Sequence, residues 1–122
     1  MNSVIEGEET IKARHILVNA LKAECFHVQE EKKFYCKNNM GEEINPPYSA
    51  DIYASIEFII ELDPAESHGG DHRTKKDNWR STNIFEQYGV KTVRLQPADI
   101  IKDKNLELTF KEVLSQLRAY EK

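Results

Sequence analysis

Apolar residues recur at steps of three and four along residues 8–24 and again along residues 106–121, which is the spacing of one helix face. We predict a helix over each segment. A third helical pattern covers residues 76–89, with Trp79 expected in the core and Gly89 a typical helix end. The apolar positions expected to be buried in the first and last helices are Ala13, Ile16, Leu17, Ala20, Leu21, Phe110, Val113, Leu114 and Leu117.

Between these helices the apolar residues alternate, as is typical of strands. Residues 26–36 alternate at both ends around the charged tetrad EEKK and predict two short strands joined by a turn. Residues 50–54 predict a further strand, and residues 56–63 follow so closely that the two would form a tight hairpin. A loop would follow, and residues 90–95 predict the last strand, leading into a connector.

The segment 56–63 indicates the fold class. Its even positions are all apolar, and Ile59 adds an apolar residue on the opposite side, as in a central strand covered on both faces. The order of elements predicts an α/β fold in which helices flank a mixed central sheet, in the order α-β-β-β-α-β-α. No repeat or linker divides the chain, so we expect residues 1–122 to form a single domain.

Composition narrows the classes of function. Hydrophobic residues make up 39% and charged residues 31%, which fits a folded domain. The formal net charge of −4 argues against a protein that holds nucleic acid mainly by a broad basic surface. No apolar run approaches the ~20 residues that span a bilayer, and the acidic N-terminal segment lacks the order of a secretory signal. We therefore expect a cytoplasmic protein with no membrane partner.

The two cysteines, Cys25 and Cys36, are too few for a disulfide framework. Together with His27 they could supply three zinc ligands. Their spacing differs from that of the common zinc sites, however, and a fourth ligand does not stand out in the sequence. We expect these thiols to behave as small buried apolar groups instead.

Three acids lie on the predicted hairpin. Side chains alternate along a strand, so Glu61 and Asp63 point to the same face, and Asp51 on the other arm could face the same way. Converging carboxylates repel one another unless a cation is present, and hard oxygen ligands suit Mg²⁺ or Mn²⁺. The three acids therefore indicate a metal site, although Glu61 and Asp63 taken alone are also typical of a solvated strand end.

Histidines and basic residues follow the acids. His68 or His72 could act as a general acid or base near neutral pH. Basic residues of the loop, the next helix and the last strand could meet a phosphate backbone, although such a loop is also typical of plain solvent exposure. These residues are Arg73, Lys75, Lys76, Arg80 and Arg94.

Taken together, these residues resemble a known group of enzymes. The pattern is Asp51-x9-Glu61-x-Asp63, then His68, then Asp77-x2-Arg80-x3-Ile84-x4-Gly89-x3-Val93-Arg94. It is similar to the PD-(D/E)xK nuclease superfamily, in the branch of the very-short-patch-repair endonucleases. The resemblance runs from about Tyr48 to Leu117 and implies a restriction-endonuclease-like fold.

The resemblance also implies roles for the acids. Asp51 and Glu61 would bind Mg²⁺ or Mn²⁺, together with the Asp63 side chain or the Leu62 carbonyl. Asp63 stands where the superfamily usually has its lysine, and an acid at this position is normal in the branch. His68 matches the branch's loop histidine one residue late, so His72 stays an alternative.

Two positions depart from the family pattern. Pro64 stands where the branch usually has glycine, after the strand that carries the acids. Many relatives have a glutamate on the first helix near the metal, where this chain has Arg14. Glu9 would serve in its place only if the helix shifted.

The function implied by the resemblance is that of a metal-dependent endonuclease that hydrolyses phosphodiester bonds in DNA, in repair or restriction. It would act alone, as a homodimer or within a larger nuclease complex. The alternative is a nuclease-like domain that binds nucleic acid or protein without catalysis. Arg14 and the acidic net charge favour that alternative.

Overall fold

The computed structural model describes residues 7–44, 47–55, 58–63 and 71–121; for residue 55 and residues 71–78 the description is limited to the backbone. The elements are α1 (Glu8–Ala23), β1 (His27–Phe34), β2 (Tyr48–Ser55), β3 (Phe58–Leu62), α2 (Asp71–Tyr88), β4 (Lys91–Leu95), α3 (Pro97–Lys102) and α4 (Glu107–Ala119). The predicted order is confirmed, with α3 as an additional short helix.

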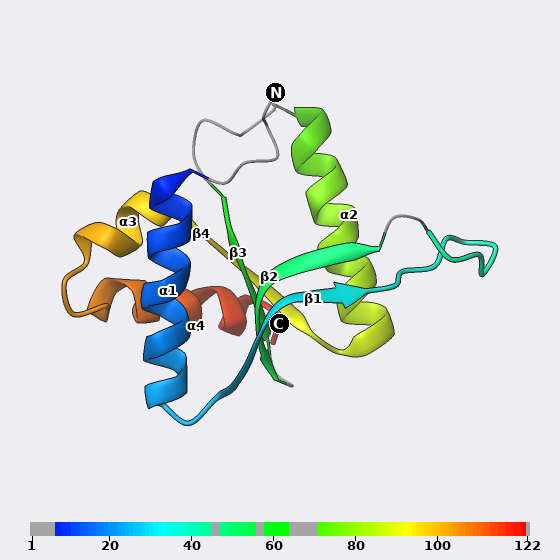
Figure 1. Cartoon of the computed structure of the whole chain (residues 1–122). Coiled ribbons are helices and arrows are strands. Elements are labelled where there is room, and N and C mark those ends of the chain that lie inside the picture. The colour runs from blue at the N-terminus through cyan, green and yellow to red at the C-terminus, as the bar shows by residue number, and fades with distance from the viewer. Residues whose placement is uncertain (1–6, 45–46, 56–57, 64–70, 122) are drawn as a thin grey trace.

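The strands form one mixed sheet in the order β1-β2-β3-β4. Strand β2 pairs antiparallel with both β1 and β3, whereas β4 runs parallel to β3. Helix α2 makes the connection between the two parallel strands and lies on one side of the sheet, while α1, α3 and α4 lie on the other (Figure 1). The predicted mixed sheet flanked by helices is therefore confirmed.

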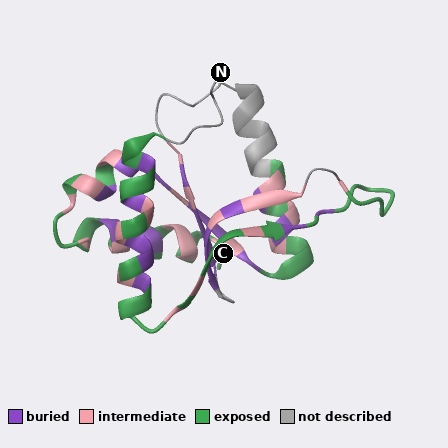
Figure 2. Ribbon diagram, viewed as in Figure 1, coloured by how far each residue is buried: buried purple, intermediate pink, exposed green. Residues whose placement is uncertain are grey.

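The sheet has a core on each face (Figure 2). The even positions of β3, from Phe58 to Leu62, pack with buried residues of α1, α3 and α4. Ile59 points the other way and packs with Tyr53 and with Ile84 of α2. Strand β3 is thus covered on both faces, as its nearly continuous apolar sequence predicts.

Helix α4 covers the outer edge of β4. The Gln116 amide accepts the N–H of Arg94 and donates to the carbonyl of Arg94, each at 2.8 Å. The Tyr120 hydroxyl accepts the N–H of Thr92 at 3.1 Å and donates to the carbonyl of Thr92 at 3.3 Å. The step from Gln116 to Tyr120 matches the step from Arg94 to Thr92, because four helix residues rise ~6 Å and two strand residues ~6.6 Å. Strand addition at this edge is therefore blocked.

Strand β1 is continuous, so the predicted turn at EEKK was wrong. Three of the four charged residues, Glu30, Glu31 and Lys33, are exposed, and an edge strand tolerates charges at successive positions. The pairing with β2 nevertheless skips one residue between the pairs Glu30–Ile52 and Lys32–Ala50. Glu31, at the skipped position, has a φ of 53°, in the left-handed region. The turn-like sequence thus produces a local distortion within the strand.

Three further predictions need correction. Helix α2 begins at Asp71 rather than residue 76, so His72 and Arg73 lie on a helix and not in a loop. Trp79, expected in the core, is 45% exposed on the outer side of α2. Leu114 is 52% exposed, because the side of α4 that meets the core carries Val113 and its neighbours at helical spacing. None of the described helices combines the length and apolar character needed to cross a membrane.

The covered edge of β4 gives a first prediction. Replacing Gln116 by alanine leaves the N–H and carbonyl of Arg94 without protein partners and should lower the free energy of unfolding by about 1–2 kcal/mol. Urea denaturation measures this loss. The matched control is Ser115→Ala, at an exposed neighbouring position of the same helix. Equal stability of the two variants would contradict the role of Gln116.

Candidate functional site

Two acids lie where β2 and β3 part. Ile52 and Ile60 are the last paired residues at this end, and Asp51 and Glu61 come next on the two strands. By strand alternation both face the same side as Tyr53 and Ile59, the side that α2 covers. Both acids are partly buried. The predicted convergence of Asp51 and Glu61 is therefore present in the structure.

Each carboxylate is held by the backbone of the opposite strand. The N–H of Leu62 donates to Oδ2 of Asp51 at 2.9 Å, and the N–H of Asp51 donates to Oε2 of Glu61 at 3.3 Å. The side chains thus satisfy backbone donors that lie just beyond the regular ladder. This exchange fixes the two carboxylates next to each other.

This proximity has an electrostatic cost. Burial raises the pKa of Glu61, and the negative charge of Asp51 raises it further, to about 8. Hydrogen bonds from the Tyr48 hydroxyl and the Asp51 N–H, and the charge of Arg94, lower the pKa but do not outweigh these effects. Glu61 therefore takes up a proton near neutral pH unless another positive charge is supplied.

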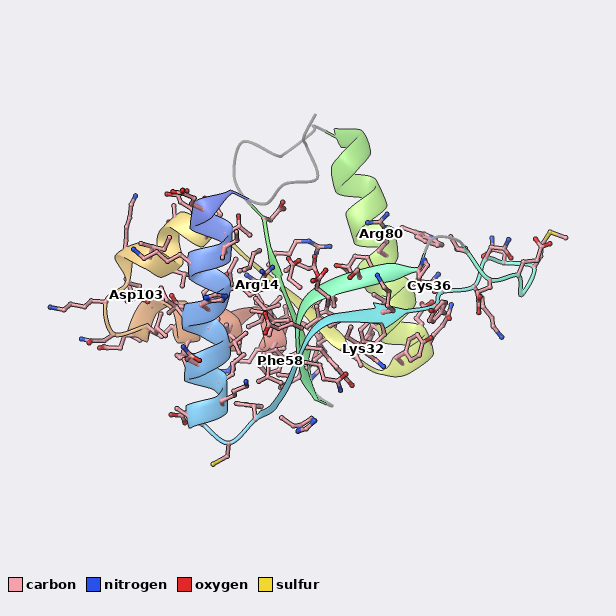
Figure 3. All side chains as sticks on the ribbon, in the orientation of Figure 1. Arg14, Lys32, Cys36, Phe58, Arg80 and Asp103 are labelled. Carbon is pink, nitrogen blue, oxygen red and sulfur yellow. The ribbon has the colours of Figure 1, made fainter. Side chains whose placement is uncertain are left out.

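Tyr48 and Arg80 complete the side of the site next to β1. The Tyr48 hydroxyl donates to the Glu61 carboxylate, and its pKa lies far above its usual range, mainly because of burial and then because of Glu61. The guanidinium of Arg80 lies 5.3 Å from the centre of the Tyr48 ring. Figure 3 shows Arg80 on α2 near Cys36, whose buried thiol has a raised pKa despite the Arg80 charge.

Arg94 brings a guanidinium to the acids from β4. It pairs with Glu61 in the parallel register, so both side chains lie on the side of the sheet that α2 covers. Its Nη2 donates to Oγ of Ser81 on α2 at 2.7 Å. Of the predicted phosphate-binding residues, Arg94 is therefore close to the acid pair, whereas Arg80 contacts the Tyr48 ring.

The third predicted acid lies one step beyond Glu61. The N–H of Asp63 donates to the carbonyl of Leu95 at 2.9 Å and extends the parallel ladder. Alternation places Asp63 on the same side of the sheet as Glu61. Within the described ranges, no group of three or more His, Cys, Asp or Glu side chains is arranged to hold a metal ion. The acid pair itself is the part of the predicted ligand set that comes together.

The remaining predicted residues are not placed. His68 and Pro64 lie outside the described residues, and for His72, Arg73, Lys75 and Lys76 only the helical backbone is described. These four belong to the first two turns of α2, the helix that also carries Arg80.

Two other candidates lie elsewhere. Arg14, at the position where relatives have a first-helix glutamate, pairs with Glu30 of β1 at 3.2 Å on the α1 side of the sheet. His27 begins β1 and Cys36 lies two residues beyond its end, so the length of this strand, ~26 Å at strand spacing, separates them. The zinc site considered from the sequence is therefore not formed. Cys36 is buried as expected, whereas Cys25 is exposed.

A hollow of about 600 Å³ lies at the end of β4, between α3 and α4. Its charged lining residues are Arg94, Lys102, Asp99, Asp103 and Glu112, so acids outnumber basic groups. Asp103 also has a structural role, because its Oδ2 accepts the N–H of Thr109 at 2.6 Å in the first turn of α4. The hollow therefore lacks the positive lining that attracts a phosphate backbone.

The acid pair predicts how stability depends on pH. The raised pKa of Glu61 means that the folded chain binds more protons than the unfolded chain between about pH 4.5 and pH 8. The contribution of Glu61 to the free energy of unfolding is complete below this pH window and is lost as the pH rises through it. Glu61→Gln cannot titrate. Between about pH 4.5 and pH 8 its free energy of unfolding should therefore fall by about 2 kcal/mol less than that of the wild type, once solvent screening of a partly exposed group is allowed for.

Urea denaturation at several pH values measures this difference. Glu86→Gln, which changes an exposed glutamate on α2, should keep the wild-type slope. Parallel pH profiles for wild type and Glu61→Gln would contradict the electrostatic account of the site.

No protein-family model, curated protein or solved structure matches this chain. The case for a function therefore rests on its residues and their geometry.

Proposed function

We propose that this chain is a metal-dependent endonuclease of the PD-(D/E)xK type, with a restriction-endonuclease-like fold, and that it hydrolyses phosphodiester bonds in DNA. The observation that carries the proposal is the pairing of Asp51 and Glu61 where β2 and β3 part, beside Arg94. At an ordinary solvated strand end, such acids would lie in water and apart from each other.

The electrostatics favour a cation at this pair. Burial and then the negative charge of Asp51 raise the pKa of Glu61, and the charge of Arg94 does not offset them. A divalent cation would supply that charge and displace the proton, and Mg²⁺ or Mn²⁺ prefers oxygen ligands of this kind. The Asp63 side chain or the Leu62 carbonyl would complete the protein ligands. When bound, the ion would lower the pKa of a water and stabilise charge on the phosphate.

Basic groups would hold the DNA beside the acids. Arg94 lies beside the acid pair on β4, and Arg80 lies over the Tyr48 ring on α2. Both would bind phosphate oxygens near the scissile bond. Arg73, Lys75 and Lys76 precede Arg80 on the same helix and would contact neighbouring phosphates. His68 or His72 would assist proton transfer. Local basic groups of this kind act even in a chain of net charge −4.

The first test is cleavage. Supercoiled plasmid and mismatched or branched oligonucleotides are incubated with Mg²⁺ or Mn²⁺, and we expect nicking that a chelator abolishes. Asp51→Asn keeps an acceptor for the Leu62 N–H but loses the charge, so nicking should fall roughly 100-fold or more. Asp99→Asn, which changes an exposed residue of α3, is the control and should cleave like the wild type. Metal-dependent cleavage by Asp51→Asn at the wild-type rate would contradict the assignment.

A second candidate function is a non-catalytic nuclease-like module that binds nucleic acid. The observation that favours it is the ion pair between Arg14 and Glu30. The first helix then carries an arginine, already paired with an acid, at the position where the family has a metal-binding glutamate. Such a module would bind through its basic groups alone and would need no ion at Asp51 and Glu61.

Trp79 separates the two candidates. It is the single tryptophan of the chain and lies half exposed on α2, close to Arg80 in sequence. DNA bound along this helix should therefore change its fluorescence. For the nuclease we expect Mn²⁺ to tighten binding at least severalfold, with the increase lost in Asp51→Asn. Identical titrations with and without Mn²⁺, together with absent cleavage, would favour the module.

A further inference from the structure

Tyr48 is a residue whose chemistry the sequence pattern does not reveal. It begins β2, three residues before Asp51, and follows the prolines that precede the strand. Strand alternation alone would place it on the face opposite Asp51. Its hydroxyl nevertheless donates to the Glu61 carboxylate across the gap between β2 and β3.

The contacts of the Glu61 carboxylate limit how it can turn. Its Oε2 accepts the N–H of Asp51 at 3.3 Å, and the carboxylate also accepts the Tyr48 hydroxyl. A carboxylate has about four lone-pair directions, so two donors leave acceptor directions open. The two donors thus fix the plane of the group while keeping part of it available to a cation.

The Tyr48 ring is itself held from several sides. Tyr48 pairs with Phe34 in the β1–β2 register and packs against the core cluster beneath α2. The Arg80 guanidinium lies over the ring, 5.3 Å from its centre, an arrangement that attracts a cation to an aromatic face. The hydroxyl is therefore delivered to Glu61 by a ring with little freedom to rotate.

We infer that Tyr48 is a positioning residue for the divalent cation, which it serves by orienting the Glu61 carboxylate through its hydroxyl. This inference rests on the proposed function, because it assumes that Asp51 and Glu61 bind the ion. Hydrogen-bond partners of metal-binding carboxylates commonly tune metal affinity by 10–100-fold. Tyr48 would thus affect the affinity for the ion rather than the chemical step. Because Arg80 lies on the ring, the same contact connects α2, where the DNA would bind, to the metal ligand.

The test compares two substitutions that each remove one hydroxyl from β2. Tyr48→Phe keeps the ring and its contact with Arg80 but loses the hydrogen bond to Glu61. Tyr53→Phe, the matched control, changes a buried tyrosine of the same strand that packs on Phe34. Mn²⁺ affinity is measured by electron paramagnetic resonance of the free ion, and thermal unfolding is followed on the same samples.

We expect Mn²⁺ to bind about tenfold more weakly to Tyr48→Phe and unchanged to Tyr53→Phe, with similar unfolding temperatures. Cleavage by Tyr48→Phe should need more Mn²⁺ but reach the wild-type kcat at saturation. Equal Mn²⁺ affinity of Tyr48→Phe and wild type would overturn the role of Tyr48 and leave the proposed function intact. Failure of the wild type to bind Mn²⁺ at millimolar concentration would overturn the proposed function itself. Equal weakening in both variants would show a general loss of packing and overturn the inference.

Discussion

The parting of β2 from β3 is the constraint on which the site depends. Strand β3 is buried on both faces and pairs with β4 along its whole length, so its position is fixed. Beyond Ile60 the ladder with β2 ends, and the N–H of Leu62 needs another acceptor. Asp51 supplies it with a carboxylate, while its own N–H binds Glu61. The backbone N–H groups just beyond the end of the ladder need acceptors, and this need brings the two acids together.

The same arrangement creates the charge deficit that the proposed chemistry would use. Strand alternation places Glu61 on the side of the sheet that α2 covers, where desolvation and the charge of Asp51 both oppose its ionisation. The charge of Arg94 relieves this only in part. In the proposed site, a proton and a cation would therefore compete for one carboxyl group, and strongly perturbed pKa values of this kind are enriched at functional sites.

Residues with a local signal were predictable from the sequence. The apolar spacing of α1 and the continuous apolar run of β3 led directly to an α/β fold with a mixed sheet, and the two-residue alternation placed Glu61 and Asp63 on one face, which Asp51 could share. Signals that depend on tertiary contacts were missed. Helix α3 has six residues, too few for a visible period. The EEKK tetrad looks like a turn, yet pairing with β2 keeps the strand continuous.

In the site too, residues with a local sequence signal were predicted, and residues that depend on tertiary contacts were missed. Tyr48 could not be found from alternation, because its hydroxyl reaches Glu61 across the gap between two strands. Ser81 and Gln116 matter only because they meet Arg94, which lies far from both in sequence. Trp79 was assigned to the core because large aromatic rings are usually buried, and only the packing of α2 through Ile84 shows which side faces out.

The central claim is that Asp51 and Glu61 together hold a divalent cation. Anomalous diffraction near the manganese edge, from crystals grown with Mn²⁺, tests it directly. The account predicts an anomalous peak within coordination distance of both carboxylates, absent in Asp51→Asn crystals. Crystals of the wild type that show no peak at this pair, or a peak only elsewhere on the chain, would contradict it.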